Sequence, residues 1–187
     1  MAPDARRAAI IRAVTPLLLE HGATVTSRQL ADAAGIAEGT IFRAFGDKES
    51  LIAAVLAAHR DGGELRAELD AIPDDLAVDD TIGRILEVLV DRMSTIVRLA
   101  IALGRPGPPH GRGHPDHAEM VARSRELVAA IAAILERHAD ELTAPPEVVA
   151  HYLRMSATAA ALPHLHPGME FTVPDLSTLV REGVVRR

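Results

Sequence analysis

TSRQLADAAGIAEGTIFRAFGDKES, residues 26–50, has the pattern of two short helices joined by a tight turn. Thr26 and Gln29 have the spacing of a capping box, in which each side chain satisfies a free backbone N–H at the start of a helix. Gly35 can adopt a positive φ at little steric cost, as a tight turn between two helices requires. The apolar pattern restarts at Ile36. The stretch therefore predicts a helix-turn-helix, whose second helix enters the DNA major groove.

The second of these helices has an apolar side and a polar side. Ile36, Ile41 and Phe45 have a spacing that lets them pack inward. The residues expected to point mostly outward are Glu38, Thr40 and Arg43.

Residues 34–45, AGIAEGTIFRAF, and residues 47–51, DKESL, resemble the signature of the TetR family of bacterial transcriptional regulators. That signature is Ala-Gly-Val-Ser-x-Gly-Thr-Leu-Tyr-x-x-Phe, a short link, and then Ser-Lys-Glu-x-Leu. Ala37 stands where the family usually has a Ser, so the second helix lacks a side-chain cap. Phe42 stands where the family usually has a Tyr whose hydroxyl reaches a DNA phosphate. We expect both differences to weaken nonspecific anchoring and to leave the fold unchanged.

The apolar periodicity outside this stretch is also helical, without a convincing strand alternation. At 187 residues the chain is long enough for one DNA-binding module and one larger domain. We therefore predict an all-α fold with an N-terminal three-helix DNA-binding head in residues 1–48. The resemblance implies that residues 49–187 form a larger C-terminal helical domain for ligand binding and dimerisation. Helices outside the helix-turn-helix are expected at about residues 4–21, 48–70, 82–100, 116–138, 146–162 and 173–184.

Composition and charge favour a cytoplasmic protein. The chain has no Cys, which excludes a disulfide framework, a Cys-based metal site and thiol catalysis. Charged residues interrupt both the N-terminus and the apolar stretch 76–103, so we expect neither a signal peptide nor a membrane span. Residues 1–48 contain six basic and five acidic residues, a charge of +1, so the remainder must carry −7 for the chain to total −6. An acidic body with a near-neutral head is compatible with DNA binding, because the contacting face sets the local potential.

The polar residues of the predicted head have different expected partners on DNA. We expect Arg43 and Thr40 to reach bases, and Glu38 to accept a hydrogen bond from a cytosine amine. Phosphate contacts are expected mainly from Thr26, Arg28 and Lys48. The full set of expected DNA-binding residues is Thr26, Ser27, Arg28, Ala37, Glu38, Thr40, Phe42, Arg43 and Lys48.

Residues 82–100 have an amphipathic pattern with a wide apolar side, and Arg92 lies near its border. A cation in that position could anchor an anionic ligand, although Arg stems also commonly run along apolar surfaces with the charge in water. A cavity in the second domain would be lined by aliphatic residues, which favours a hydrophobic or amphipathic small molecule. The expected ligand-binding residues are Leu89, Arg92, Met93, Ile96, Leu127, Ile131, Tyr152 and Met155.

Residues 104–116, GRPGPPHGRGHPD, break the helical periodicity and predict a loop. His110, His114 and His117 lie in or directly after it, which raises the alternative of a metal site. Their spacing is not diagnostic, because the intervening Pro and Gly oppose a helical register and no carboxylate pattern accompanies them. We interpret these residues as solvated histidines, and the same holds for the histidines at 164 and 166. Neither a metal nor a cofactor is predicted.

Residues 156–161 are a run of small residues, which allow helix backbones to approach closely. The family resemblance implies dimerisation through the last two long helices of each subunit, paired as a four-helix bundle. Packing within one subunit is the alternative explanation for any single apolar stripe. The residues expected at the dimer interface are Ala157, Ala160, Ala161, Leu176, Leu179 and Val180.

These patterns predict a ligand-responsive transcriptional regulator that binds a palindromic double-stranded DNA operator as a homodimer. The resemblance implies a repressor, and a hydrophobic or amphipathic small molecule is expected to release it from DNA. A constitutive DNA-binding dimer without an inducer is the alternative. An enzyme would need a nucleophile–base pair or a metal constellation, and the sequence offers neither. No contact with a membrane is expected.

Overall fold

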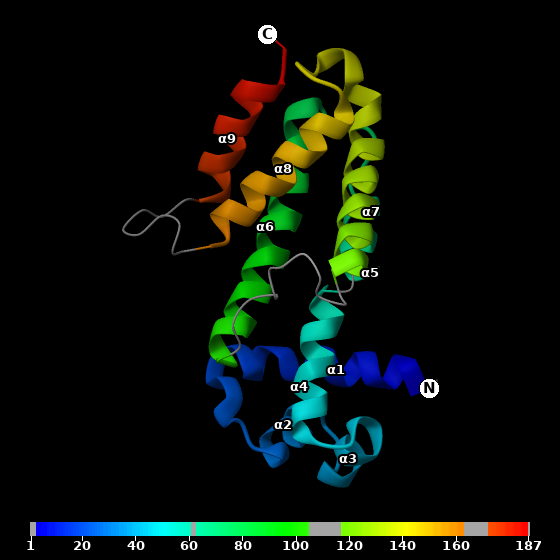
Figure 1. Ribbon diagram of the computed structural model, residues 1–187, viewed down its shortest axis with the longest axis vertical. Coiled ribbons are helices and arrows are strands. Elements are labelled where there is room, and N and C mark those ends of the chain that lie inside the picture. The colour runs from blue at the N-terminus through cyan, green and yellow to red at the C-terminus, as the bar shows by residue number, and fades with distance from the viewer. Residues whose placement is uncertain (1–2, 61–62, 105–116, 163–171, 187) are drawn as a thin grey trace. The chain divides into compact units, whose positions relative to one another are not determined.

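The computed structural model describes residues 3–60, 63–104, 117–162 and 172–186, which are helical almost throughout (Figure 1). Within these residues no strand is assigned, and a single isolated bridge joins Leu142 to Val185. The prediction of an all-α fold is confirmed. No helix in the described part of the chain is long and apolar enough to span a membrane.

The chain divides into two compact units. Unit 1 comprises Met1–Asp61 and Thr95–Pro109, and unit 2 comprises Gly62–Ser94 and His110–Arg187. The boundary falls within helix α6 (Val78–Ala102), which contributes residues to both units.

Unit 1 has a core that is shared by four N-terminal helices and the end of α6. The N-terminal helices are α1 (Pro3–His21), α2 (Ser27–Ala33), α3 (Glu38–Phe45) and α4 (Lys48–Arg60), and a short 3-10 turn, η1 (Gly22–Thr24), follows α1. Fully buried members of the core are Val14, Leu18, Leu30, Ile41, Leu51, Val55 and Leu99. This unit is larger than the predicted domain of residues 1–48, because the apolar side of α4 and two leucines near the end of α6 pack into the same core.

Gly22 is required at the end of α1 for two reasons. Its φ is 60°, in the left-handed region that favours glycine. In addition, a Cβ at this position would lie 2.1 Å from the carbonyl oxygen of Ala102. The sequence predicts the end of the helix at this glycine, but the close approach of Ala102 is visible only in the structure.

The single helix predicted over residues 48–70 is described only on either side of residues 61–62, which lie outside the described residues. The structure has two helices in this stretch, α4 and then α5 (Gly63–Asp70). The sequence carries consecutive glycines at 62 and 63, and each glycine in a helix interior costs about 1 kcal/mol relative to Ala. The apolar residues on either side have helical spacing, so periodicity alone did not separate the two helices.

Unit 2 contains α5, most of α6 and the remaining helices, which are α7 (His117–Leu135), η2 (Glu136–Glu141, a 3-10 helix), α8 (Pro146–Ala160) and α9 (Val173–Val184). Its core draws on every one of the α-helices, and α7 and α8 pack closely against each other. Residues of this core with no exposed surface are Leu69, Ile82, Ile85, Leu86, Ile131, Leu135, Leu142, Ala150 and Leu153. The helices predicted at 82–100, 116–138 and 146–162 are confirmed, except that the last turns of the second are 3-10 helix.

Local signals explain where the last two helices begin. Pro146 occupies the first position of α8, where its fixed φ suits a helix start. Thr172 and Asp175 form a capping box at the start of α9, with Thr172 Oγ1 accepting from the backbone N–H of Asp175 at 3.2 Å. The helix predicted at 173–184 is confirmed, but the capping box was not predicted.

Candidate nucleic-acid interface

The capping box predicted from Thr26 and Gln29 is present at the start of α2. Thr26 Oγ1 accepts from the backbone N–H of Gln29 at 3.2 Å, and Gln29 Oε1 accepts from the backbone N–H of Thr26 at 2.9 Å. Ser27 is half-buried and Arg28 is exposed in the first turn of α2. The positive end of the helix dipole lies at this turn, which suits a contact with a phosphate group.

The turn between α2 and α3 is held by backbone hydrogen bonds around Gly35. Gly35 has a φ of 63° and donates to the carbonyl of Asp32 at 3.1 Å, while Ile36 donates to the carbonyl of Ala31 at 3.0 Å. Among the residues that the structure describes, no atom lies within 4 Å of the position that a Cβ of Gly35 would occupy. Glycine is therefore needed here for its backbone conformation alone, as the sequence predicts.

Helix α3 presents a mixed face to solvent and an apolar face to the core of unit 1. Ile41 is fully buried and Phe45 is 7% exposed, whereas Glu38 and Arg43 are exposed. Phe42 is 43% exposed, one turn after Glu38. The inward and outward directions predicted for these residues are confirmed. The other outward residue, Thr40, is half-buried, and Ile36 is half-buried in the turn that precedes α3.

The start of α3 lacks a side-chain cap. Ala37 is the N-cap residue and is exposed, and no side chain bonds the first N–H groups of the helix. Gly46 ends the helix with a φ of 90°. These two positions limit α3 to eight residues.

Asp47 and Lys48 organise the start of α4. Asp47 Oδ1 accepts from the backbone N–H of Ser50 at 2.6 Å, and this bond, together with the Ser50 side chain, lowers the pKa of the Asp47 carboxyl. Lys48 Nζ donates to the carbonyl of Ala23 at 2.7 Å, so its ammonium ties α4 to the turn after α1. Lys48 is half-buried and keeps two further N–H donors for a phosphate. The sequence gives no local signal for the bond to Ala23, because Lys48 and Ala23 are 25 positions apart.

Arg7 supports α3 from α1. Its guanidinium donates to the carbonyl of Ala44 and lies over the ring of Phe45, 4.4 Å from the ring centroid. A cation at that distance from an aromatic face is attracted to it. The sequence carries no local signal for this contact, because Arg7 and Ala44 are 37 positions apart.

The predicted ligand-binding residues differ in their burial and are divided between the two units. Leu89 and Ile131 are buried in the core of unit 2 and Leu127 packs against it, with Met93 half-buried on α6. Ile96 belongs to unit 1. The residues on α8 are exposed instead, with Tyr152 at 47% and Met155 at 63%.

Arg92 is buried in unit 2, with only 9% of its surface exposed. Its guanidinium donates to Glu64 Oε2 at 3.3 Å, across to α5. The structure therefore places a carboxylate of the chain itself at the cation that the sequence analysis considered for an anionic ligand. The sequence suggested either an anionic ligand at Arg92 or an Arg92 charge in water, and neither alternative included Glu64.

The residues predicted at a dimer interface are divided between the core and the surface. Ala157, Ala161 and Val180 are 2%, 5% and 1% exposed, so they pack within the subunit. Ala160 and Leu176 are half-buried, and Leu179 is 60% exposed. Val148, which is not among the predicted residues, is 55% exposed on α8.

The histidines considered for a metal site lie outside the described residues at positions 110, 114, 164 and 166, and the side chain of His117 is not described either. Among the side chains that are described, no group of three or more His, Asp or Glu is placed to hold a metal ion.

Comparisons with known proteins agree with this geometry. Residues 10–55 match the model of the bacterial regulatory proteins of the tetR family. A TetR transcriptional regulator from Streptomyces coelicolor is similar over 96% of this chain and 98% of its own, with 19% identity and a TM-score of 0.62. A TetR family transcription regulator from Marinobacter aquaeolei VT8 is similar over 98% and 97%, with 16% identity and a TM-score of 0.54.

SmeT in complex with triclosan is similar over 97% of this chain and 92% of its own, with 18% identity and a TM-score of 0.58. No curated protein sequence matches the chain significantly. The segment that matches the family model covers α2, α3 and the capped start of α4, which form the candidate interface. Residues 10–55 are therefore similar to the DNA-binding segment of the TetR family, and the fold of the chain is similar to that of the solved TetR-family regulators.

Proposed function

We propose that this protein regulates transcription by binding a palindromic DNA operator as a homodimer, and that an apolar or amphipathic small molecule releases it. The observation that carries the proposal is the exposed side of α3, where Glu38, Phe42 and Arg43 lie within two turns of one helix. The other side of α3 is anchored in the core of unit 1 by Ile41 and Phe45. A helix held in this way is suited to enter the major groove. Repression, rather than activation, follows from the family, and binding to the chromosome would place the protein in the cytoplasm.

Arg43 is the residue we assign to base recognition. It is exposed in the last turn of α3, and arginine pairs with the acceptors of guanine through two hydrogen bonds. Glu38 in the first turn can accept from a cytosine amine, and Thr40 between them can contact either kind of base. The ring of Phe42 has no hydroxyl and would make an apolar contact, as with a thymine methyl group.

Selection of binding sites from a pool of random duplexes tests this assignment. We expect the wild-type protein to enrich an inverted repeat. Replacing Arg43 with Ala should weaken binding to that sequence by about 5- to 150-fold, the equivalent of about 1–3 kcal/mol for one lost base contact. Arg125→Ala is the matched control, since Arg125 is an exposed arginine of α7 in unit 2. If the wild-type protein enriched no sequence, the proposed function would be rejected.

The homodimer is proposed to form through the exposed apolar side of α8. Val148, Tyr152 and Met155 are spaced four and three residues apart, so they lie on one side of the helix, and each is 47–63% exposed. Leu179 adds a 60% exposed side chain on α9, which packs against α8. Clustered apolar side chains at a surface are typical of protein–protein interfaces. A second copy of this chain is the partner we propose for this surface, because a palindromic operator requires two symmetry-related DNA-binding heads.

Ligand binding is proposed for unit 2, near Leu89, Met93, Leu127 and Ile131. The similar protein SmeT was solved with triclosan, a small molecule, which supports a ligand of this kind. The aliphatic character of these residues favours an apolar or amphipathic molecule. The protein is proposed to exchange between a DNA-binding and a non-binding conformation. To change the ratio of these conformations from about 1:99 to 99:1, the ligand must bind the non-binding one more tightly by roughly 5.5 kcal/mol.

A constitutive DNA-binding dimer is the second candidate. The burial of Leu89 and Ile131 in the core of unit 2 favours it, because a ligand would have to displace existing contacts. A thermal-shift screen of apolar compounds, triclosan among them, followed by an operator titration with each stabilising compound, separates the two. The sensing proposal expects at least one stabilising compound to weaken operator binding. Compounds that stabilise the protein and leave operator affinity unchanged would support the constitutive dimer.

A further inference from the structure

Arg6 and Arg7 are consecutive residues of α1 with different surroundings. The guanidinium of Arg7 is occupied by the Ala44 carbonyl and the Phe45 ring. Arg6 is exposed, and within the residues that the structure describes its guanidinium has no hydrogen bond, ion pair or ring contact. One of two neighbouring cations therefore holds the head together, and the other is available to a partner.

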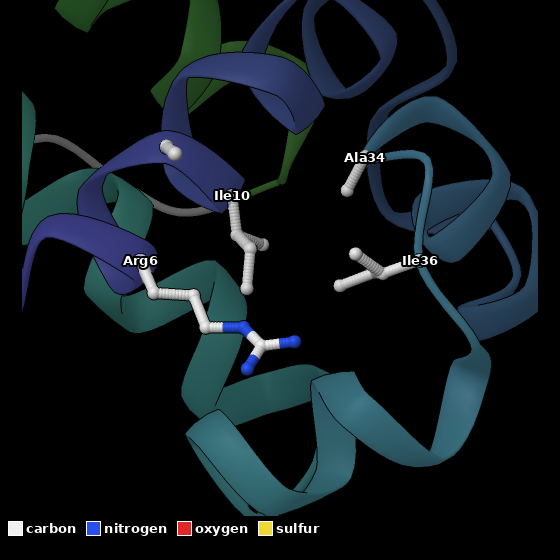
Figure 2. Close-up of a pocket in the computed structure, with 5 residues that line it drawn as sticks. Arg6, Ile10, Ala34 and Ile36 are labelled. Carbon is white, nitrogen blue, oxygen red and sulfur yellow. The ribbon is translucent and has the colours of Figure 1, made fainter. Parts of the chain in front are cut away.

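Arg6 lines a cleft between α1 and the turn of the helix-turn-helix. The cleft, which we call the Arg6 cleft, has a volume of about 320 Å³ and is lined by Arg6, Ala9, Ile10, Ala34 and Ile36. Figure 2 shows the Arg6 side chain extending from α1 into the space that faces Ala34 and Ile36. All five residues belong to unit 1, so a single compact unit builds the cleft.

The chemistry of the cleft suits one anionic group. Among the described residues that line it, Arg6 alone is charged, and the other side chains are aliphatic. Arginine is also the side chain that binds phosphate oxygens through two parallel hydrogen bonds.

The position of the cleft selects the source of that anion. Ala34 and Ile36 belong to the turn that leads directly into α3. A duplex whose major groove holds α3 carries phosphates along both edges of that groove, with one charge per about 1.7 Å of its axis. A phosphate of the DNA backbone would therefore be available close to the start of α3.

We propose that the Arg6 cleft binds one backbone phosphate of the DNA contacted by α3. This inference rests on the proposed DNA binding and adds a contact from α1, a helix that otherwise only supports the head. Arg6 fixes the position of the head on DNA and does not read its sequence.

The test compares Arg6→Gln with Arg12→Gln, each of which removes one positive charge from α1. Arg12 is also exposed but does not line the cleft. Binding of the full-length proteins to a fluorescent duplex of mixed sequence, about three helical turns long, is measured as a function of salt concentration. The slope of log K against log [salt] is negative, and loss of one phosphate contact should reduce its magnitude by about 0.9. The ratio of the wild-type binding constant to that of Arg6→Gln should therefore fall about 3.5-fold between 50 and 200 mM salt.

Two further variants constrain the result. Arg6→Lys retains the charge and should keep the wild-type slope. Ala9→Glu places a carboxylate one turn after Arg6, inside the cleft, and should reduce the slope at least as much as Arg6→Gln. Circular dichroism of each variant checks that the helices are intact.

The outcomes are distinguishable. A reduced slope for Arg6→Gln with an unchanged slope for Arg12→Gln supports the proposal. Equal slopes for all the variants, or equal reductions for Arg6→Gln and Arg12→Gln, would overturn the cleft as a specific contact while leaving DNA binding intact. Absence of DNA binding by the wild-type protein would reject the proposed function and this inference with it.

Discussion

The candidate interfaces of the two units carry different kinds of side chain. In unit 1 the candidate interface combines one exposed ring, Phe42, with the charged side chains of Glu38 and Arg43 and the cation of Arg6. In unit 2 the exposed side of α8 carries the aliphatic and aromatic groups of Val148, Tyr152 and Met155. A surface with charges suits a nucleic acid, whose backbone is anionic, whereas an apolar stripe suits another protein surface. The difference suggests that each unit serves one partner, and this separation can be tested by disturbing one unit at a time.

The largest effect is expected from Gly22→Ala in unit 1. An Ala at this position combines the strain of a positive φ with overlap of the Ala102 carbonyl oxygen. Urea unfolding should show a loss of about 3 kcal/mol or more, from about 1–2 kcal/mol of backbone strain plus the cost of relieving the overlap. Gly35→Ala is the control, because it has the same sign of φ with open space around it, and should lose only about 1–2 kcal/mol.

If Gly22→Ala and Gly35→Ala destabilised the protein equally, the close approach of Ala102 would be irrelevant to stability. The two units would also be less separate than we propose if Gly22→Ala abolished dimerisation as well as DNA binding.

The next effect concerns the stripe on α8. Tyr152→Glu should weaken the dimer by about 2 kcal/mol or more, roughly 30-fold in its dissociation constant, since a buried aromatic anchor would be replaced by a charge. His151→Glu is the control, because His151 is exposed and lies beside Tyr152 in the sequence. Sedimentation velocity measures both. A dimer that tolerates Tyr152→Glu and fails with His151→Glu would move the interface to another side of α8.

A buried polar network in unit 2 should give a smaller effect. His138 is 8% exposed, and its Nδ1–H donates to Glu141 Oε1 at 2.9 Å. Its Nε2 accepts from Arg137 Nε at 3.3 Å, and it therefore also accepts from the Thr81 hydroxyl at 3.2 Å. Thr81→Val removes that hydroxyl at a fully buried position and should cost about 1–2 kcal/mol of unfolding free energy. DNA affinity of the folded variant should be unchanged. A change in DNA affinity larger than twofold would show that this network influences unit 1.

Lys48→Ala should affect DNA binding and stability together. The loss of one phosphate contact should weaken all sequences alike and reduce the salt slope by about one. Loss of the bond to the Ala23 carbonyl should also lower the unfolding free energy by about 1 kcal/mol, a value reduced for the partial exposure of Lys48. Arg28→Ala is the control and should change only the salt slope. Weakening confined to the cognate operator would contradict a phosphate role for Lys48.

The smallest effect is expected from the cap of α4. The hydrogen bond from the Ser50 N–H lowers the pKa of Asp47 in the folded state. The ionised carboxylate therefore stabilises the folded protein above its usual pKa, and this contribution is lost as the pH falls through the lowered value. Asp47→Asn should slightly lower the thermal midpoint at pH 7, and the difference from wild type should shrink below about pH 4. A difference that stays constant with pH would reject the carboxylate as the cause.

Short-range features of the chain were predictable because their signals lie within a few residues. The capping box at Thr26, the positive φ of Gly35 and the cap at Asp47 each follow from residue types at a fixed local spacing. The buried side of α3 followed from periodicity. The DNA-binding assignments made from these features remain proposals.

Contacts between distant residues were not predictable in the same way. Arg7 meets Ala44 across 37 positions, Lys48 meets Ala23 across 25, and Arg92 meets Glu64 across 28. When only the sequence was considered, Lys48 had an expected phosphate partner, Arg92 had a possible anionic ligand, and Arg7 had no assigned partner. Their actual partners are carbonyl and carboxylate groups that the fold brings to them.

The sequence by itself determined the all-helical class, the helix-turn-helix and its similarity to the TetR family model, since periodicity, capping residues and a gap-free motif are properties of neighbouring positions. The tertiary structure alone decided which apolar and charged side chains remain available. Ala157 and Met155 lie two positions apart on α8, yet one is 2% and the other 63% exposed. Periodicity identifies the two sides of a helix, but only the packing of α7 and α9 against α8 decides which side is covered, because burial depends on neighbours that are distant in sequence.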